Sequence, residues 1–258
     1  MPSATLTSVV LLSALLLEST TANDLPNYFP TCHLNEDGLN DCILNGFKTL
    51  KSYVGHGIEE IGLPSLKPLY VARLEIGQEE ALANYSMILN NFTVWGLDNY
   101  DVKEFRYDPN TTTFHGRLEY DKVIMSTVPY NISGQILLAP LKGEGFGQAI
   151  IGPLSGSFEV NGNIKEKDGI DYYNTTNIHV HLDIADGYYF LSNIFDNPYL
   201  TRTTVEIFNI NSKLMTSVVT PVFEEMTKLG ITSIMESLTN ALSYEQMFPI
   251  INSLSVLP

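Results

Sequence analysis

The feature of this sequence that most constrains its fold is a change of hydrophobic period partway along the chain. From about residue 69 to about residue 190, segments rich in β-branched and aromatic residues alternate with short turns, which is typical of strands. From about residue 200 onward, apolar residues recur every three or four positions, as on one face of a helix. The helical stripe consists of Leu214, Val218, Val222, Met226 and Leu229. Pro221 lies within this stripe and should kink the helix or begin a new one.

Six segments of the first region are predicted strands. They are Val71–Ile76, Met87–Leu97, Thr113–Pro129, Gly134–Leu141, Phe146–Asn163 and Tyr172–Ile184. The connections Asp108–Asn110, Asn161–Asn163 and Asp168–Gly169 are short, so neighbouring strands should pair antiparallel. Several segments are longer than about 12 residues, which favours a long curved sheet over a compact sandwich.

A shorter helix is predicted before the strands, over Asn40–Ile58. Its apolar positions are Ile43, Phe47, Leu50, Val54 and Ile58. Gly55 and Gly57 flank its end, and the two prolines of Gly62–Pro68 require an extended segment next. The order of helix, strands and long helix, with no linker or repeat, predicts one α+β domain.

The first 22 residues form a predicted secretory signal peptide, which leaves residues 23–258 as the mature domain. Val9–Leu17 is an apolar run with a single serine, and small residues lead to an expected cleavage site after Ala22. This run is far shorter than the roughly 20 residues that span a bilayer, and no later segment reaches that length. We therefore expect a secreted, extracellular protein without a membrane span.

The cysteines and the glycosylation sequons agree with secretion. Cys32 and Cys42 are the only cysteines, and an oxidising compartment favours their pairing. A zinc site is disfavoured because two cysteines without a nearby histidine pair do not supply four ligands. The candidate glycosylation sites are Asn84, Asn91, Asn110, Asn131 and Asn174.

The charge balance excludes one large class of partner. The chain has 14 Lys and Arg against 29 Asp and Glu, a formal net charge of -15. Nucleic-acid binding needs clustered basic residues, so we expect no nucleic-acid partner. An anionic membrane surface should repel the chain for the same reason. The acidic surface should keep the protein soluble and monomeric.

Two glycine-containing strings resemble sites for catalysis or phosphate binding only in part. Gly152–Gly156 contains a serine, but its spacing and context differ from those of a hydrolase nucleophile turn. Gly143–Gly147 has the glycine density of a phosphate loop but lacks a lysine and a following helix. We interpret it as a loop between two strands. No pair of acidic residues stands out as an acid–base couple, so we expect no enzyme and no cofactor.

Two histidines are the only candidate metal ligands. His179, His181 and Asp183 share one strand face, and a zinc site there would need a further ligand from elsewhere. This is the sole basis for a metalloenzyme hypothesis. The favoured interpretation is a solvated strand face, with Val180, Leu182 and Ile184 pointing inward.

Large apolar side chains are abundant where a curved sheet would face the long helix. Hydrophobic residues make up 44% of the chain. A packed core explains any single one of these residues, whereas the whole set also permits an apolar cavity for a small molecule. The predicted lining residues are Trp95, Tyr130, Phe146, Val222, Phe223 and Met226.

Several motifs, in a fixed order, resemble the insect haemolymph juvenile hormone binding protein and takeout-like family. The run Gly57–Ile76 (GIEEIGLPSLKPLYVARLEI) carries the family's glycine, proline and Lys-Pro-Leu pattern. Further matches are Leu25-Pro26, the Cys32 and Cys42 pair, Asn91–Leu97, Gly134–Gly145, Lys167–Gly169, Leu191–Phe195 and Met247–Pro249. The resemblance covers essentially the whole mature chain.

The resemblance implies a tubular lipid-binding fold and a carrier function. In this fold a long, strongly curved antiparallel sheet wraps a long C-terminal helix and encloses an apolar tunnel. The family also implies an N-terminal disulfide, here Cys32–Cys42, and a non-catalytic protein that binds a juvenile hormone-like terpenoid or a fatty acyl compound. An alternative function is an extracellular glycoprotein that acts through a protein partner or receptor, with a vestigial cavity.

Overall fold

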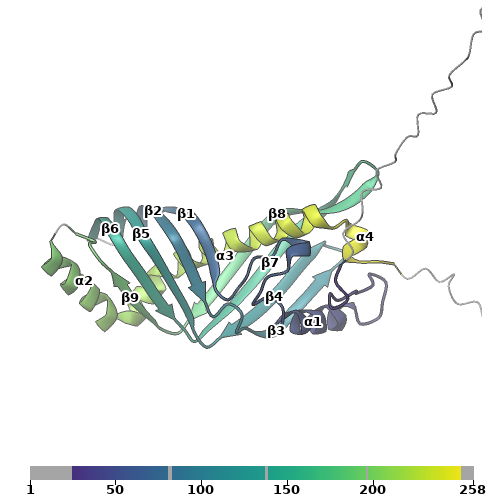
Figure 1. Cartoon of the computed structure of the whole chain (residues 1–258), viewed down its shortest axis with the longest axis horizontal. Coiled ribbons are helices and arrows are strands. Elements are labelled where there is room, and N and C mark those ends of the chain that lie inside the picture. The colour runs from purple at the N-terminus through teal and green to yellow at the C-terminus, as the bar shows by residue number, and fades with distance from the viewer. Residues whose placement is uncertain (1–24, 81–82, 137–138, 196, 251–258) are drawn as a thin grey trace, which may run out of the picture.

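The computed structural model describes residues 25–80, 83–136, 139–195 and 197–250 (Figure 1). The signal peptide expected at residues 1–22 lies outside the described residues. The helices are α1 (Leu39–Leu50), the 3-10 helix η1 (Glu59–Ile61), α2 (Pro198–Ile210), α3 (Ser212–Ala241) and α4 (Tyr244–Met247). The strands are β1 (Leu69–Glu80), β2 (Ala83–Trp95), β3 (Asp101–Asp108), β4 (Thr113–Tyr120), β5 (Val123–Ile136), β6 (Ala139–Ile151), β7 (Leu154–Lys167), β8 (Ile170–Ile184) and β9 (Gly187–Leu191).

The strands form two antiparallel sheets, where the sequence predicted one. The five-stranded sheet has the order β1-β2-β5-β6-β9, and the four-stranded sheet has the order β3-β4-β7-β8. The sheets are joined by a long hairpin, because β4 continues into β5 and β6 continues into β7, and the chain also passes between the sheets from β2 to β3 and from β8 to β9. Pairing keeps its register across the junction: Tyr120 pairs with Leu154, and Val123 pairs with Ile151.

Glycines allow the backbone to change direction at this junction. Gly152 has φ 137°, and a Cβ placed on it would lie 2.4 Å from the Asp121 carbonyl oxygen. Gly96 has φ 93°, and its Cβ would lie 2.6 Å from the Lys122 carbonyl oxygen. Both positions therefore require glycine, because any other residue would combine an unfavourable φ with a backbone collision. The expected strands over Thr113–Pro129 and Phe146–Asn163 are each interrupted here.

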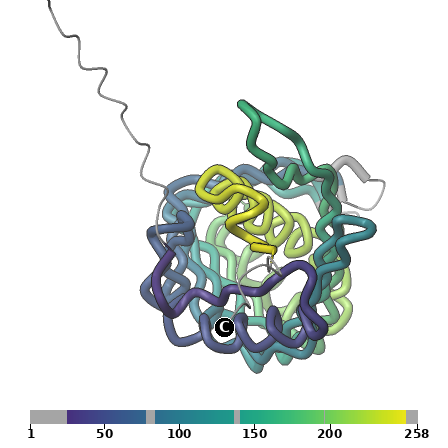
Figure 2. The backbone as a smooth tube through the Cα atoms, turned by 90° about the vertical axis from the view of Figure 1, so that its right-hand side faces the viewer, coloured from purple at the N-terminus to yellow at the C-terminus, as the bar shows by residue number. Residues whose placement is uncertain are grey.

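The long C-terminal helix α3 lies inside the curve of the sheets, as predicted. It packs along β8 and contacts β9 and β1. Viewed along the molecule, the strands and α1 surround it (Figure 2). The helix runs through Pro221 without ending, so Pro221 does not begin a new helix. The fold class predicted from the order of elements is therefore confirmed.

The N-terminal region closes one end of the molecule. Cys32 and Cys42 form the expected disulfide, which ties the first loop to α1. The helix ends at Leu50 instead of continuing to Ile58. Its continuation is replaced by tertiary hydrogen bonds: the Leu66 N–H donates to the Val54 carbonyl at 2.9 Å, and the Ser65 hydroxyl donates to the Gly55 carbonyl at 2.8 Å.

Several strand predictions need correction. β3 and β9 were not predicted, and Asn161–Asn163 lies at a bulge inside β7 instead of forming a turn. Gly143–Gly147 lies inside β6 and is not a loop. Its glycines are explained by close packing, since a Cβ on Gly143 would lie 2.0 Å from the Asn193 carbonyl oxygen. The turns at Asp108–Asn110 and Asp168–Gly169 are confirmed.

Helix α2 covers β9, one of the two edge strands of the five-stranded sheet. The Asn209 side chain accepts a hydrogen bond from the Tyr189 N–H at 2.9 Å and donates one to the Tyr189 carbonyl at 2.8 Å. It thus takes the place of a neighbouring strand at one residue of β9, which blocks pairing with another chain there.

Among the described residues, no helix has the length and apolarity needed to cross a membrane.

Candidate functional site

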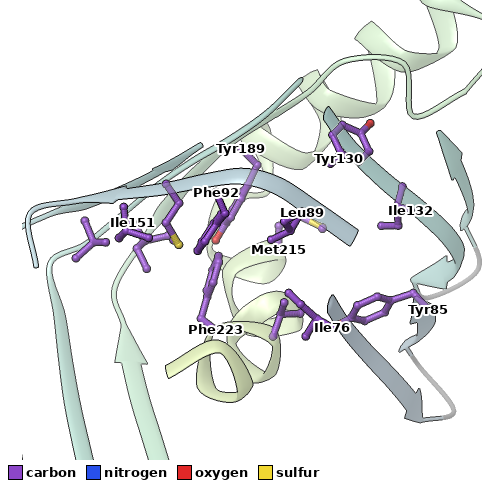
Figure 3. Packing of buried hydrophobic residues seen from close by; sticks show 14 of the residues in the cluster. Ile76, Tyr85, Leu89, Phe92, Tyr130, Ile132, Ile151, Tyr189, Met215 and Phe223 are labelled. Carbon is purple, nitrogen blue, oxygen red and sulfur yellow. The ribbon is translucent and has the colours of Figure 1, made fainter. Parts of the chain in front are cut away.

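An apolar cluster lies between the five-stranded sheet and α3, and it also includes Leu154 and Leu182 from the four-stranded sheet. We call it the sheet–helix cluster. Its buried members are Ile76, Tyr85, Leu89, Phe92, Val94, Val123, Met125, Tyr130, Ile132, Leu141, Ile151, Leu154, Leu182, Tyr189, Ile194, Met215, Val222 and Phe223. Figure 3 shows Phe223 on α3 pointing toward Phe92 on β2. The cluster is the largest apolar region that the sheet and the helix share, and we take it as the candidate site.

A row of backbone irregularities decides which side chains of the sheet point toward α3. On β2 the buried positions are odd-numbered up to Leu89 and even-numbered from Phe92. The change occurs at Asn91, which has φ 47°. On β5 the same change lies between Thr127 and Tyr130, where the pairing with β6 shifts register. Strand alternation therefore continues on both sides of these irregularities. The odd-numbered residues of β2 and β5 are buried before the irregularity, and the even-numbered residues are buried after it.

The structure brings together four of the six predicted lining residues. Tyr130, Val222 and Phe223 are buried members of the sheet–helix cluster, and Met226 packs against it half-buried. Whether these residues line a ligand stays a prediction.

Trp95 and Phe146 lie elsewhere. Trp95 is 40% exposed and Phe146 is 36% exposed, and neither belongs to the cluster. Trp95 follows the parity change at Asn91, so its side chain faces away from α3. Phe146 is even-numbered on β6, whose buried positions Leu141 and Ile151 are odd-numbered, and its ring lies 5.8 Å from that of the exposed Phe190.

Sequence reasoning missed most of the cluster's residues on the sheet. Leu89, Phe92 and Ile132 belong to segments whose composition is typical of strands. Which side of the sheet their side chains point to depends on the backbone irregularities of β2 and β5. The signal available in the sequence was the Asn90-Asn91 pair, because asparagine tolerates positive φ better than most residues. That signal indicates a local kink but does not reveal which strands share it.

The cluster contains a few polar groups that are held by hydrogen bonds. The Tyr130 hydroxyl donates to the Ser192 carbonyl at 2.5 Å. The Tyr189 hydroxyl lies 2.9 Å from the Thr216 hydroxyl, and both residues are buried. These contacts fix β5 and β9 to their neighbours without introducing a charge into the apolar interior. Burial raises the pKa of Tyr130 to about 12.

The raised pKa of Tyr130 predicts a loss of stability in alkali. The neutral hydroxyl is favoured in the fold, so its contribution is complete below the ordinary tyrosine pKa of about 10 and disappears as pH rises through about 12. About 2–3 kcal/mol of the free energy of unfolding should be lost over this window because of this group. Urea unfolding at several pH values would measure it. Tyr130→Phe should lose stability less steeply with pH, and equal slopes would contradict the assignment.

A groove on the surface borders the sheet–helix cluster. It has a volume of about 340 Å³ and lies between the edge strands β1 and β8 beside α3. Its lining residues are Gly77, Tyr85, Ile178, His179, Val180, Pro221, Glu224, Glu225 and Lys228. Tyr85 belongs to the cluster and Val180 packs against it, so the groove borders the apolar interior. Small-molecule sites in proteins are typically about 300–1,000 Å³, so the groove falls in their lower range.

Charged side chains at the rim of the groove fasten α3 to the edge of β8. Glu224 accepts a hydrogen bond from the Leu182 N–H at 2.9 Å and lies 3.3 Å from the His181 ring. Lys228 lies 3.8 Å from Glu225 on the same helix. The rim is therefore polar while the inner end is apolar. This arrangement suits an amphiphilic or largely apolar molecule that enters tail first.

The predicted metal-ligand candidates form no metal site in the described part of the chain. No three His, Cys, Asp or Glu residues come together there. His179 and His181 are exposed; the His179 ring lies 2.8 Å from the Asn177 amide nitrogen. Leu182 is buried, and Val180 and Ile184 are half-buried. The interpretation as a solvated strand face is confirmed by this burial.

The five glycosylation sequons differ in accessibility. Asn84, Asn110 and Asn131 are exposed. Asn91 is also exposed, but its side-chain amide donates to the Val128 carbonyl at 2.7 Å and accepts from the Tyr70 hydroxyl. Asn174 is half-buried and its amide donates to Asn163. A glycan fits best at the first three asparagines, because it would not break a side-chain bond that holds one strand to its neighbour.

The fold and the sequence both match known proteins. The solved structure of Takeout 1 from Epiphyas postvittana is similar to this chain with a TM-score of 0.66 and 17% identity, over 86% of this chain and 100% of that one. The circadian clock-controlled proteins daywake of Drosophila yakuba and of Drosophila melanogaster are each 22% identical to it over 231 residues. Those residues are 86% of this chain and 88% of each relative.

The structural match confirms that the chain has the fold of Takeout 1, with long antiparallel sheets and a C-terminal helix. The sheets do not close into a barrel, since β1, β9, β3 and β8 are edge strands. The model of the haemolymph juvenile hormone binding protein family matches residues 8–249. The protein therefore belongs to the haemolymph juvenile hormone binding protein family.

Proposed function

We propose that the protein is a secreted, non-catalytic carrier that binds a hydrophobic small molecule between the five-stranded sheet and α3. The observation that carries this proposal is the groove of about 340 Å³ with a charged rim, whose lining shares Tyr85 with the sheet–helix cluster. The family, described as binding juvenile hormone, supports a ligand of similar chemistry. The ligand class is a juvenile hormone-like terpenoid or a fatty acyl compound.

The chemistry of the groove is consistent with this class of ligand. An apolar chain would contact Tyr85, Val180 and the cluster, and its polar end would remain near Glu224 and Lys228. Each methylene taken from water contributes about 0.8 kcal/mol. A chain of about ten methylenes therefore gives several kcal/mol after the costs of association. Affinity would come mainly from buried apolar surface, and the rim would set the orientation.

The acidic surface supports transport through an aqueous fluid. The formal net charge of -15 favours solubility and keeps copies of the protein apart, as expected of a monomeric carrier. The predicted signal peptide, the disulfide and the exposed sequons all support an extracellular location.

The proposal is tested by identifying what the protein carries. We expect the protein secreted from insect cells to retain a lipid that native mass spectrometry and lipid extraction detect. After delipidation it should take up a labelled fatty acid or a juvenile hormone analogue with saturable binding. A protein that is isolated without lipid and also takes up neither probe would rule the function out.

Two substitutions that fill the groove would locate the site. Val180→Trp at its inner end and Glu225→Trp at its rim should each reduce probe uptake at least about tenfold, because the ring would occupy the groove. Ile170→Trp is the matched control, since Ile170 is 47% exposed at the start of β8 and does not line the groove. Uptake that is unchanged in both groove variants, with unchanged thermal unfolding, would place the ligand elsewhere.

A further inference from the structure

Helix α2 carries an apolar face that no other part of the described chain covers. Tyr199 is 74% exposed, Leu200 50%, Ile207 52% and Ile210 81%. The helical spacing of these four residues places them within one sector of the helix, roughly 100° wide. We call this sector the outer face of α2. Four large apolar side chains exposed together on one short helix are unusual for a soluble protein.

The opposite face of α2 is anchored to the body of the protein. Val205 and Phe208 pack against the sheet–helix cluster. Thr201 is buried and exchanges hydrogen bonds with the backbone of Phe195, and Asn209 is bonded to both backbone groups of Tyr189. The exposed residues are therefore held on a fixed helix. Their exposure does not result from a loose segment that lacks a place to pack.

The position and charge of α2 set it apart from the rest of the surface. The helix lies at one end of the elongated molecule, opposite α1 and α4 (Figure 1). Its two charged residues, Arg202 and Glu206, lie beside the outer face and neutralise each other, with Nε and Oε1 2.9 Å apart. In a chain with a net charge of -15, the outer face of α2 is thus an uncharged patch.

These features favour a lipid surface over a second protein molecule as the partner. A stable protein interface uses about 20–30 residues on each side, whereas the whole of α2 has 13 residues. A helix can bind a bilayer interface through a few inserted apolar side chains, without a partner of complementary shape. Tyrosine is favoured at such interfaces, and Tyr199 lies at the start of the helix.

We propose that the outer face of α2 docks the protein onto an uncharged lipid surface, end-on. An anionic surface is disfavoured, because the acidic body of the protein would be repelled as it approached. The inner face of the same helix contacts the sheet–helix cluster, so docking would place the lipid surface one helix away from the candidate site. The inference concerns membrane contact and does not depend on the carried ligand.

Flotation of the full secreted protein with phosphatidylcholine vesicles tests the proposal. We expect the wild-type protein to float with the vesicles, and Ile207→Ser together with Ile210→Ser to lower its partition coefficient at least about a hundredfold. Ile170→Ser is the matched control, because Ile170 is 47% exposed at the start of β8, and its binding should equal that of the wild type. Replacing half of the phosphatidylcholine by phosphatidylserine should weaken wild-type binding.

Several outcomes would overturn the proposal. Wild-type protein that stays in solution, or a double variant that floats as well as the wild type, excludes docking through α2. Stronger binding to the phosphatidylserine vesicles would assign the contact to basic groups instead. Sedimentation velocity that finds a wild-type dimer, lost in the double variant, would identify a second copy as the partner. Uptake of labelled fatty acid without vesicles should be unchanged in the double variant, so the carrier function is tested separately.

Discussion

Replacing Phe223 by alanine is expected to lower the free energy of unfolding by about 3–5 kcal/mol, as for other large-to-small changes of buried aromatic residues. Phe223 is 8% exposed on α3 and belongs to the sheet–helix cluster, where it faces Phe92 across the interior. Its removal takes away apolar contacts between the helix and the five-stranded sheet and leaves a cavity. Urea unfolding of the delipidated protein would measure the change.

The size of this effect also distinguishes a packed core from an open tunnel. If a tunnel already lies beside Phe223, its ring has fewer contacts to lose, and the change should fall below about 1 kcal/mol. Such a small change would contradict the packed cluster described above. Leu214→Ala is the control on the same helix: Leu214 is 60% exposed, so its replacement should alter stability by less than about 0.5 kcal/mol.

Gly152→Ala is expected to lower the free energy of unfolding by at least about 3 kcal/mol, because strain and a collision act together. At φ 137° a residue with a side chain is strained, which costs about 1–3 kcal/mol. The new Cβ would also lie 2.4 Å from the Asp121 carbonyl oxygen, a backbone atom that cannot rotate away. The connection between β6 and β7 would have to move away from the connection between β4 and β5 to relieve the collision. Thermal or urea unfolding would detect the loss.

Two other glycines serve as matched controls for this substitution. Gly169 has φ 78°, and a Cβ added to it would meet no atom within 4 Å, so Gly169→Ala carries strain without a collision and should cost less than Gly152→Ala. Gly230 lies within α3 and is equally open, so Gly230→Ala should stabilise the protein by up to about 1 kcal/mol. Equal effects at Gly152 and Gly169 would show that the junction is not specially constrained.

The order of elements was predictable because it depends on local periodicity. The region of strands, the helix stripe that contains Val222 and the antiparallel pairing all follow from residues close in sequence. Errors arose where distant contacts compete with local preference. α1 stops at Leu50 because the Gly62–Pro68 segment binds the carbonyls beyond it, and Gly143–Gly147 is a strand because its glycines accommodate the Asn193 backbone.

The candidate site was better predicted on the helix than on the sheet, where only Tyr130 of the three predicted lining residues joins the cluster. A helix keeps its period of 3.6 residues, so Val222, Phe223 and Met226 were correctly placed on the face toward the sheet. A strand alternates every two residues, so one irregularity reverses the facing of all residues after it. The row through Asn91 and Thr127 does so on β2 and β5, and Trp95 consequently points outward.

The sequence by itself determined the class of fold, the disulfide pair and an interior rich in apolar side chains, because composition and periodicity are properties of neighbouring residues. Only the tertiary structure decided that the sheet splits in two at Gly152, which side chains of each strand face α3, and where a groove opens between β1 and β8. It also showed that α2 keeps Ile207 and Ile210 exposed. The physical reason is that facing, edges and exposure depend on contacts between residues far apart in the chain.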